Sequence, residues 1–219
     1  MRRQLPLFPL GAVLYPGLLM PLHVFEDRYR ELVADLLALP EEAREFGIVA
    51  IREGRETGID GITALYEVGC TARLRQVEEY DDGRFDIVTT GSTRFRLVGL
   101  DESQSYLRGD VELLDDAPGD EEAAVVAAGV RRLFGRYRAV LTGDGDESQE
   151  LPDDPRVLSY LVAAAMILDL SDKQALLAAP DVSTRLHAEL DLLRRETRLL
   201  RELQMLPAVE LTRSPISPN

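Results

Sequence analysis

Four prolines divide the apolar run near the start of the sequence, LPLFPLGAVLYPGLLMPLHVF (residues 5–25). Proline lacks the backbone N–H that a helix uses, and inside a helix each one costs about 3 kcal/mol. A membrane span needs roughly 20 uninterrupted apolar residues, and a signal-peptide core needs about 7 to 15. Pro6, Pro9, Pro16 and Pro21 leave room for neither. We therefore expect extended structure here, with no export signal and no membrane anchor.

The same prolines predict where the extended run bends. Tyr15-Pro16-Gly17-Leu18 places proline and then glycine at the two central positions that a type II turn prefers. The segment LPLFPLGAV (5–13) and the segment LLMPLHVF (18–25) are then two strands joined at one tight turn.

The rest of the first 116 residues predicts one helix and further short strands. Apolar residues recur at helical spacing through EDRYRELVADLLALP (26–40), which Pro40 ends. In EVGCTARLRQV (67–77), alternation places Cys70 on a buried face and Thr71 on an exposed one. The Asp81-Asp82-Gly83 turn predicts a hairpin with RFDIVTTG. The other predicted strands are FGIVAI (46–51), TRFRLVGL (93–100) and YLRGDVELL (106–114).

The second half predicts helices only. APGDEE (117–122) separates the last strand pattern from a helical stripe. Asp154-Pro155 marks a helix start, and Ser171 with Gln174 fits a capping box. A last helix is expected from about Val182 to Met205. The pattern thus predicts an α+β chain with a mostly β part (1–116), a helical part (117–206) and a tail (207–219).

The net charge and the cysteine content limit the classes of binding partner and the cellular compartment that we expect. The net charge of −14 and the pI near 4.6 disfavour nucleic acid and anionic membranes, since both would repel this chain. Cys70 is the only cysteine, so an intramolecular disulfide and a cysteine metal cluster are excluded. A reducing cytoplasm fits this content best, and we expect no nucleic-acid or membrane partner.

Strong catalytic motifs are missing from the sequence. Lys173 has no glycine loop before it, so it does not belong to a P-loop. Ser171 and Lys173 lie two residues apart and do not share a helix face. His23 and His187 lack a second metal-binding histidine at helical spacing. We therefore predict no catalytic residue, no metal and no cofactor.

LPLFPLGAVLYPGLLMPLHVFEDRYRELV resembles the amino-terminal substrate-recognition domain of Lon proteases, and especially stand-alone bacterial LON-domain proteins. FGIVAI, YEVGCTARLRQVEEYDDGRFDIVTTGSTRFRLVGL and DKQALLAAPDVSTRLHAELDLLRRE follow in the family's order, so the resemblance covers about residues 4 to 205. Asp27 replaces the usual proline after Phe-Glu. The resemblance implies a PUA-like pseudo-β-barrel followed by an α-helical bundle. Full Lon proteases continue into ATPase and Ser-Lys peptidase modules, which this sequence does not contain.

The leading hypothesis is accordingly a non-catalytic module that recognises polypeptide clients, including unfolded ones. Tyr15, Phe25, Asp27, Arg28 and Arg30 are the candidate binding residues, because apolar and charged groups converge around the first turn and helix. Phe25 also fits the core stripe of the helix, so a purely structural role competes with binding. Partnership in trans with a protease or an ATPase and the oligomeric state stay open.

Two other functions compete with polypeptide recognition. A small-molecule or hydrolytic site in the groove between barrel and bundle would use a carboxylate such as Asp27 or Glu67. Nucleic-acid binding would need a basic stripe along adjacent strands, and the acidic net charge disfavours it. The arginines that such a stripe would use are Arg73, Arg75, Arg94 and Arg96.

Overall fold

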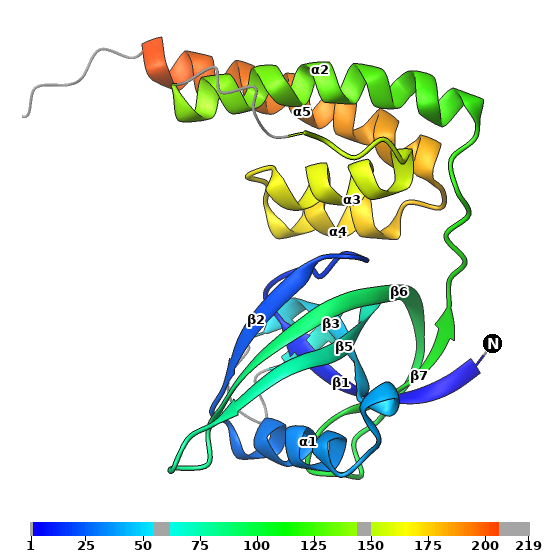
Figure 1. Cartoon of the computed structure of the whole chain (residues 1–219), viewed down its shortest axis with the longest axis vertical. Coiled ribbons are helices and arrows are strands. Elements are labelled where there is room, and N and C mark those ends of the chain that lie inside the picture. Colours follow the sequence, from blue (N-terminus) through cyan, green and yellow to red (C-terminus); the bar gives the residue numbers. More distant parts are fainter. Residues whose placement is uncertain (1, 55–61, 144–149, 206–219) are drawn as a thin grey trace, which may run out of the picture.

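The computed structural model describes residues 2–54, 62–143 and 150–205 and shows a ring of strands with a helical bundle stacked on it (Figure 1). This arrangement confirms the predicted α+β fold, although the ring is not a regular barrel. The first half contains β1 (Arg2–Leu10), β2 (Leu19–Val24), α1 (Asp27–Leu37), the 3-10 turn η1 (Glu41–Ala43), β3 (Glu45–Gly54), β4 (Ile62–Leu65), β5 (Val68–Glu79), β6 (Phe85–Asp101) and β7 (Arg108–Leu113). The bundle contains α2 (Glu121–Thr142), α3 (Pro155–Ala165), α4 (Leu170–Ala178) and α5 (Val182–Met205).

The ring closes through a parallel pair. Its strand order is β1-β7-β6-β5-β3, and β1 returns to β3 in parallel with Leu7 opposite Gly47. All the other pairs are antiparallel within the described residues. β2 and β4 lie outside the ring, on β6 and β3 respectively, which makes the barrel irregular. The 17-residue β6 pairs with β2 along its first half and with β7 along its second half.

The predicted turn at residues 15–18 is present, but its strands do not pair with each other. Gly17 has φ +81°, and the Leu18 N–H donates to the Tyr15 carbonyl oxygen at 3.2 Å, as in a type II turn. β1 pairs with β3 and β7, whereas β2 pairs with β6. Gly91 of β6 secures the turn, because its N–H donates to the Leu18 oxygen and its oxygen accepts from the Gly17 N–H.

The interior of the ring is packed beneath α1. Phe8 and Tyr29 stack with ring centroids 4.0 Å apart, so the helical stripe faces the core as predicted. Cys70 is buried as expected, and burial raises the pKa of its thiol to about 12. Thr71 is also buried, which corrects the prediction of an exposed face. A break in the β5–β6 register lies beside it, and the Thr71 hydroxyl oxygen accepts from the Thr93 N–H at 3.0 Å.

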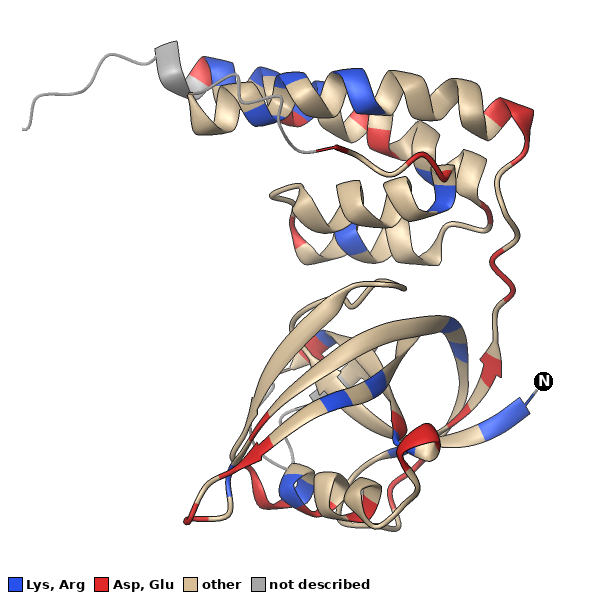
Figure 2. Ribbon diagram, in the orientation of Figure 1, with Lys and Arg blue, Asp and Glu red and all other residues tan. Residues whose placement is uncertain are grey.

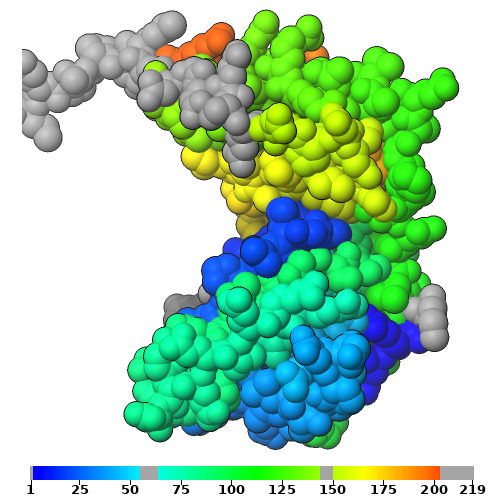
Figure 3. All heavy atoms as spheres, in the orientation of Figure 1, coloured from blue at the N-terminus to red at the C-terminus, as the bar shows by residue number. Residues whose placement is uncertain are grey.

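α3 and α4 lie between the ring and the long helices α2 and α5 (Figure 1), and the space-filling view shows the same order (Figure 3). Asp154 caps α3 as predicted, accepting from the N–H groups of Arg156 and Val157. The capping box predicted for α4 is wrong, because Asp169 caps that helix and the Gln174 side chain reaches the ring instead.

β7 ends at Leu113 and α2 begins at Glu121, on either side of the predicted boundary at residue 116. The division into two domains stays a prediction. The predicted tail lies outside the described residues. Within the described ranges, none of the helices is long and apolar enough to cross a bilayer.

Candidate functional site

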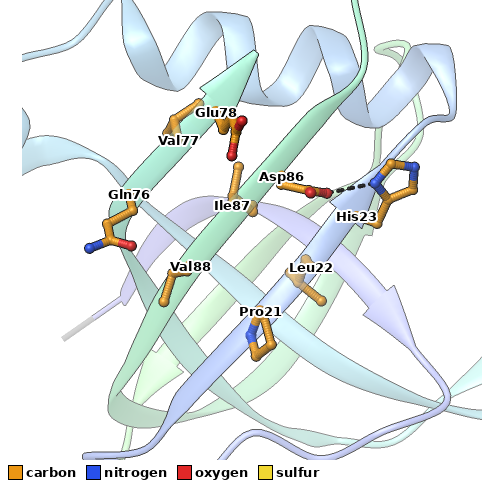
Figure 4. Close-up of a pocket in the computed structure, with 9 residues that line it drawn as sticks. All are labelled: Pro21, Leu22, His23, Gln76, Val77, Glu78, Asp86, Ile87 and Val88. Atoms are coloured by element: carbon orange, nitrogen blue, oxygen red, sulfur yellow. Dashed lines mark hydrogen bonds and ion pairs between the residues drawn. The ribbon is translucent and has the colours of Figure 1, made fainter. Parts of the chain in front are cut away.

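Three neighbouring strands present one outward surface. The pairing places Pro21 of β2, Val88 of β6 and Gln76 of β5 in one row. His23, Asp86 and Glu78 form the next row (Figure 4). Alternate side chains point inward, where Ile87 joins the core and Leu22 packs against it. A hollow of about 720 Å³ lies here, lined by Pro21, Leu22, His23, Gln76, Val77, Glu78, Asp86, Ile87 and Val88. We call the outer face the surface formed by Leu19, Pro21, His23, Phe25, Gln76, Glu78, Tyr80, Asp86 and Val88.

β2 borders this surface with an unpaired edge. Among the residues that the structure describes, β2 pairs with β6 alone. The Leu18 carbonyl oxygen accepts from Gly91 of β6, and backbone groups alternate in direction along a strand. The backbone groups of Leu19, Pro21 and His23 therefore point away from β6. Pro21 fits this placement, since a proline on an edge removes no ladder hydrogen bond.

A polar and aromatic cluster occupies the far end of the outer face. His23 Nδ1 lies 2.6 Å from Asp86 Oδ1, and the Tyr80 hydroxyl donates to Asp86 Oδ2 at 2.6 Å. The His23 ring centroid lies 6.1 Å from that of Phe25 and 6.4 Å from that of Tyr80. The hydrogen bond from Tyr80, followed by the contact with His23, lowers the pKa of the Asp86 carboxyl.

The predicted binding residues lie in two separate places. Phe25 is 52% exposed at the end of the outer face, and the Asp27 side chain is exposed at the start of α1. Arg30 donates to the Gly83 carbonyl oxygen at 2.6 Å and to Asp27 at 3.0 Å. Arg28 pairs with Glu26 at 3.0 Å. Four of the five predicted residues therefore cluster around β2 and α1, and their role in binding stays a prediction.

Tyr15 is in the second place, the junction of ring and bundle. It is 1% exposed, and its hydroxyl donates to the Lys173 carbonyl oxygen at 2.8 Å. Its ring centroid lies 6.0 Å from that of Tyr160 in α3. Tyr15 thus joins the ring to the bundle in this structure, and direct contact with a client would require the junction to open.

A buried polar network extends from Tyr160 through the junction. Arg94 of β6 donates to the carbonyl oxygens of Leu177 and Ala179, at 2.9 and 2.5 Å, and to Asp116 at 3.2 Å. The Tyr160 hydroxyl donates to Asp116 at 2.7 Å. Arg94 is therefore a structural residue, which removes it from the basic stripe that nucleic-acid binding would have needed; Arg73, Arg75 and Arg96 are exposed.

Arg185 and Glu189 of α5 lie fully buried beside this network. Arg185 donates to Ser159 at 2.9 Å and lies 4.0 Å from the centroid of the Tyr160 ring. Neither carboxylate oxygen of Glu189 has a hydrogen-bond partner among the described residues. Burial raises the pKa of Glu189 well above its ordinary value, and the nearby Arg185 opposes this shift.

The junction also holds a hollow of about 420 Å³. Its charged and hydroxyl-bearing residues are Ser92, Thr93, Arg94, Asp115, Asp116, Arg156 and Tyr160. Neither Asp27 nor Glu67 lines it, so the carboxylates predicted for this groove are corrected to Asp115 and Asp116. Across residues 2–54, 62–143 and 150–205, the structure shows no group of three His, Cys, Asp or Glu side chains placed to hold a metal ion.

The sequence interpretation missed His23, Tyr80 and Asp86 as neighbours. Alternation along β2 places Leu19, Pro21 and His23 on one face and was visible in the sequence. The partners on β6 and β5 depend on the pairing register, which local patterns do not reveal.

The strand ring topped by a helical bundle is an α+β fold that this chain shares with solved Lon N-terminal domains. The Lon N-terminal domain protein from Xanthomonas campestris is 25% identical, with a TM-score of 0.62 over 86% of this chain and 98% of that one. The N-terminal domain of the Mycobacterium avium complex Lon protease shares the fold at 20% identity, with a TM-score of 0.66 over 88% of this chain and 98% of that one.

The family model "ATP-dependent protease La (LON) substrate-binding domain" matches residues 4–195, and this chain belongs to that family. Lon protease 2 of Myxococcus xanthus is 28% identical over 203 residues, which cover 90% of this chain and 24% of that protein. Lon protease of Escherichia coli K12 is 28% identical over 212 residues, covering 90% and 26%. The chain thus spans about a quarter of the length of the curated relatives it matches.

Proposed function

We propose that this protein is a non-catalytic recognition module that binds extended polypeptide segments along the edge of β2 and across the outer face. The unpaired backbone edge of β2 carries this proposal. A polypeptide that adds a strand to an open edge forms main-chain hydrogen bonds, which do not depend on its sequence. An edge of this kind suits clients whose chain is unfolded, because a folded client has already paired its backbone groups.

Exposed apolar side chains flank that edge. Leu19 is 68% exposed and Phe25 is 52% exposed, at opposite ends of β2. Both can pack against the side chains of an added strand, and burial of apolar area stabilises such a complex. A short segment buries less area than the roughly 1,600 Å² of a standard protein interface, so we expect a dissociation constant on the order of micromolar.

The family match supports the same proposal. The matched model is named for substrate binding, and the relatives are named Lon proteases. We propose that the clients are cytoplasmic polypeptides and that a protease or an ATPase acting in trans is the partner that processes them.

Fluorescence anisotropy tests the proposal directly. A labelled, permanently unfolded polypeptide is titrated with the protein, beside the same polypeptide in its folded form and a short RNA. We expect saturable binding of the unfolded form only. Binding that does not discriminate between the unfolded and folded forms, or no binding to the unfolded form, would contradict the proposal.

Matched variants locate the site. Leu19→Ser combined with Phe25→Ser should weaken binding at least about fivefold, which corresponds to roughly 1 kcal/mol. Val125→Ser on α2 is the control, since Val125 is 75% exposed and lies in the bundle. Equal affinities for the double variant and the control would place the site elsewhere.

A small polar ligand in the junction hollow is the second candidate function. The observation that favours it is a 420 Å³ space lined by both arginine and aspartate side chains. Arg94 and Asp116 already pair with each other there, which leaves fewer free groups for a ligand. A thermal-shift screen of small zwitterions and anions, repeated with Arg156→Ala, tests this candidate.

A further inference from the structure

We propose that the outer face selects extended segments in which a lysine or an arginine lies close to apolar residues. This inference rests on the proposed function and specifies its substrate class. It starts from the charge of the β5–β6 hairpin, and it is tested by an experiment that separates the failure of selectivity from the failure of binding.

The hairpin beside β2 is strongly acidic. Residues 76–88 contain five carboxylates and a single basic residue, Arg84. Figure 2 shows these acidic positions toward the end of the hairpin that points away from the bundle. Arg84 pairs with Asp82 at 2.8 Å, so its charge is already compensated. The carboxylates of Glu78 and Glu79 are exposed and form no ion pair or hydrogen bond with other described residues. The hairpin end of the outer face therefore attracts a cation and repels an acidic segment, whereas the exposed Arg73 and Arg75 lie on β5 toward the Leu19 end.

The strand register brings this charge within reach of the β2 edge. Neighbouring strands lie about 4.8 Å apart, so an added strand would lie one spacing from His23 and two spacings, roughly 10 Å, from Asp86. A long basic side chain opposite His23 can extend over that ring toward Asp86 and Glu78. Asp86 is suited to this role because its hydrogen bonds favour the ionised carboxylate.

Aromatic rings surround the position that the cation would occupy. His23 and Phe25 stack at 6.1 Å, and Tyr80 meets the His23 ring edge-on at 6.4 Å. The faces of Phe and Tyr rings attract cations, and the aliphatic stem of a lysine or an arginine can pack on the same rings. A carboxylate among aromatic rings thus recognises both parts of a basic side chain.

The apolar contacts set the spacing of the preferred motif. Leu19 and His23 are four residues apart and point to the same side of β2, and the ring of Phe25, two residues further on, lies beside the His23 ring. A bound segment would place a basic residue opposite His23. One apolar residue, four positions away along the segment, would lie opposite Leu19. A second apolar residue, two positions away in the other direction along the segment, would lie opposite Phe25. Moving the basic residue by a single position would turn it to the opposite face.

The test uses four labelled peptides of equal length that share this apolar spacing. The position opposite His23 is lysine, glutamine or glutamate in three of them, and in the fourth the lysine is moved by one residue. We expect the first peptide to bind at least about fivefold tighter than the glutamine and shifted-lysine peptides, with glutamate weakest. This advantage should shrink at about 0.5 M salt, because salt screens exposed charges.

Two variants and one control complete the test. Glu78→Gln alone should reduce the preference for lysine, and Glu78→Gln with Asp86→Asn should abolish it. Asp191→Asn on α5, an exposed carboxylate in the bundle, should leave the preference unchanged. Equal, saturable binding of all four peptides would overturn the inference while the proposed function stands. Equal binding of the two lysine peptides would mean that the protein attracts positive charge without recognising its position, and this result would also overturn the inference. Failure of every peptide to bind would overturn the proposed function itself.

Discussion

The hydroxyl of Tyr15 donates a hydrogen bond of 2.8 Å to the backbone carbonyl oxygen of Lys173, 158 residues further along the chain. Two further sets of hydrogen bonds join α4 to the first half of the chain. The Gln174 side-chain amide donates to the Val68 carbonyl oxygen at 2.7 Å, and Arg94 reaches the carbonyl oxygens at the end of α4. The first half of the chain is therefore tied to α4 near the middle of the helix and at its C-terminal end.

Tyr15→Phe should lower the free energy of unfolding by about 1 to 2 kcal/mol, because it removes a buried donor and leaves the Lys173 carbonyl oxygen without it. Urea denaturation measures the change. Polypeptide binding to the outer face should persist, since Tyr15 lies away from β2's open edge. If the Tyr15→Phe protein were as stable as the wild type, the hydrogen bond would make no net contribution to the free energy of unfolding.

Asp116→Asn should destabilise the protein by roughly 3 to 5 kcal/mol. The Asp116 carboxylate lies 3.2 Å from Arg94 and 3.5 Å from Arg185, so its loss leaves two buried guanidinium groups without their counterion. Asp115→Asn is the matched control, because Asp115 is the adjacent residue and its carboxylate is exposed. Thermal unfolding of both variants makes the comparison, and we expect the control within about 0.5 kcal/mol of wild type.

Glu189→Gln should change how stability depends on pH. The folded protein holds the pKa of Glu189 well above its ordinary value of 4.5, so the folded state binds this proton more tightly than the unfolded state does. The resulting stability is fully present below pH 4.5 and is lost as the pH rises through the raised pKa. Glutamine does not titrate, so the variant should gain stability relative to wild type as the pH rises across that window. Denaturation of both proteins between about pH 4 and 9 gives the difference. Parallel pH profiles would contradict the assignment.

Gly91→Ala should be strongly destabilising. A Cβ at this position would lie 2.2 Å from the Tyr15 carbonyl oxygen, and the 15–18 turn would have to move away from β6. Gly135→Ala in α2 is the opposite control, since a Cβ there meets no atom within 4 Å. Alanine favours a helix, so we expect this control to gain about 0.5 to 1 kcal/mol. Circular-dichroism melting curves distinguish the two outcomes.

Local chemistry made much of the fold predictable. The prolines of the first run exclude a helix, Pro16 and Gly17 specify the turn, and the stripe through α1 fixes its buried face. The Asp81-Asp82-Gly83 turn correctly predicted that β5 pairs with β6, but the partners of the other strands were not predictable from local patterns. β2 pairs with β6 rather than β1, because pairing is decided by burial and register across the whole ring.

Buried charge was the hardest feature to foresee. Arg185 and Glu189 are four residues apart, a spacing typical of exposed helix pairs, yet both are fully buried. Arg94 and Arg96 lie on either side of Phe95 in β6, yet Arg94 is buried and Arg96 is exposed. The difference arises from the helices that cover these positions, which the local pattern does not contain. At the outer face the same limit applied, since alternation gave His23 its direction but not its contacts with Tyr80 and Asp86.

The pairing of β1 with β7 has a consequence for synthesis. Arg2 of β1 lies opposite Glu112 of β7, so β1 can pair with β7 only after the roughly 110 residues between these two positions have been synthesised. At about 5 to 20 residues per second, translation imposes a wait of roughly 5 to 20 s. During that interval the nascent chain exposes strand edges of the kind that we propose the mature protein recognises in its clients. During its own synthesis the chain would thus resemble the unfolded clients that we propose for it.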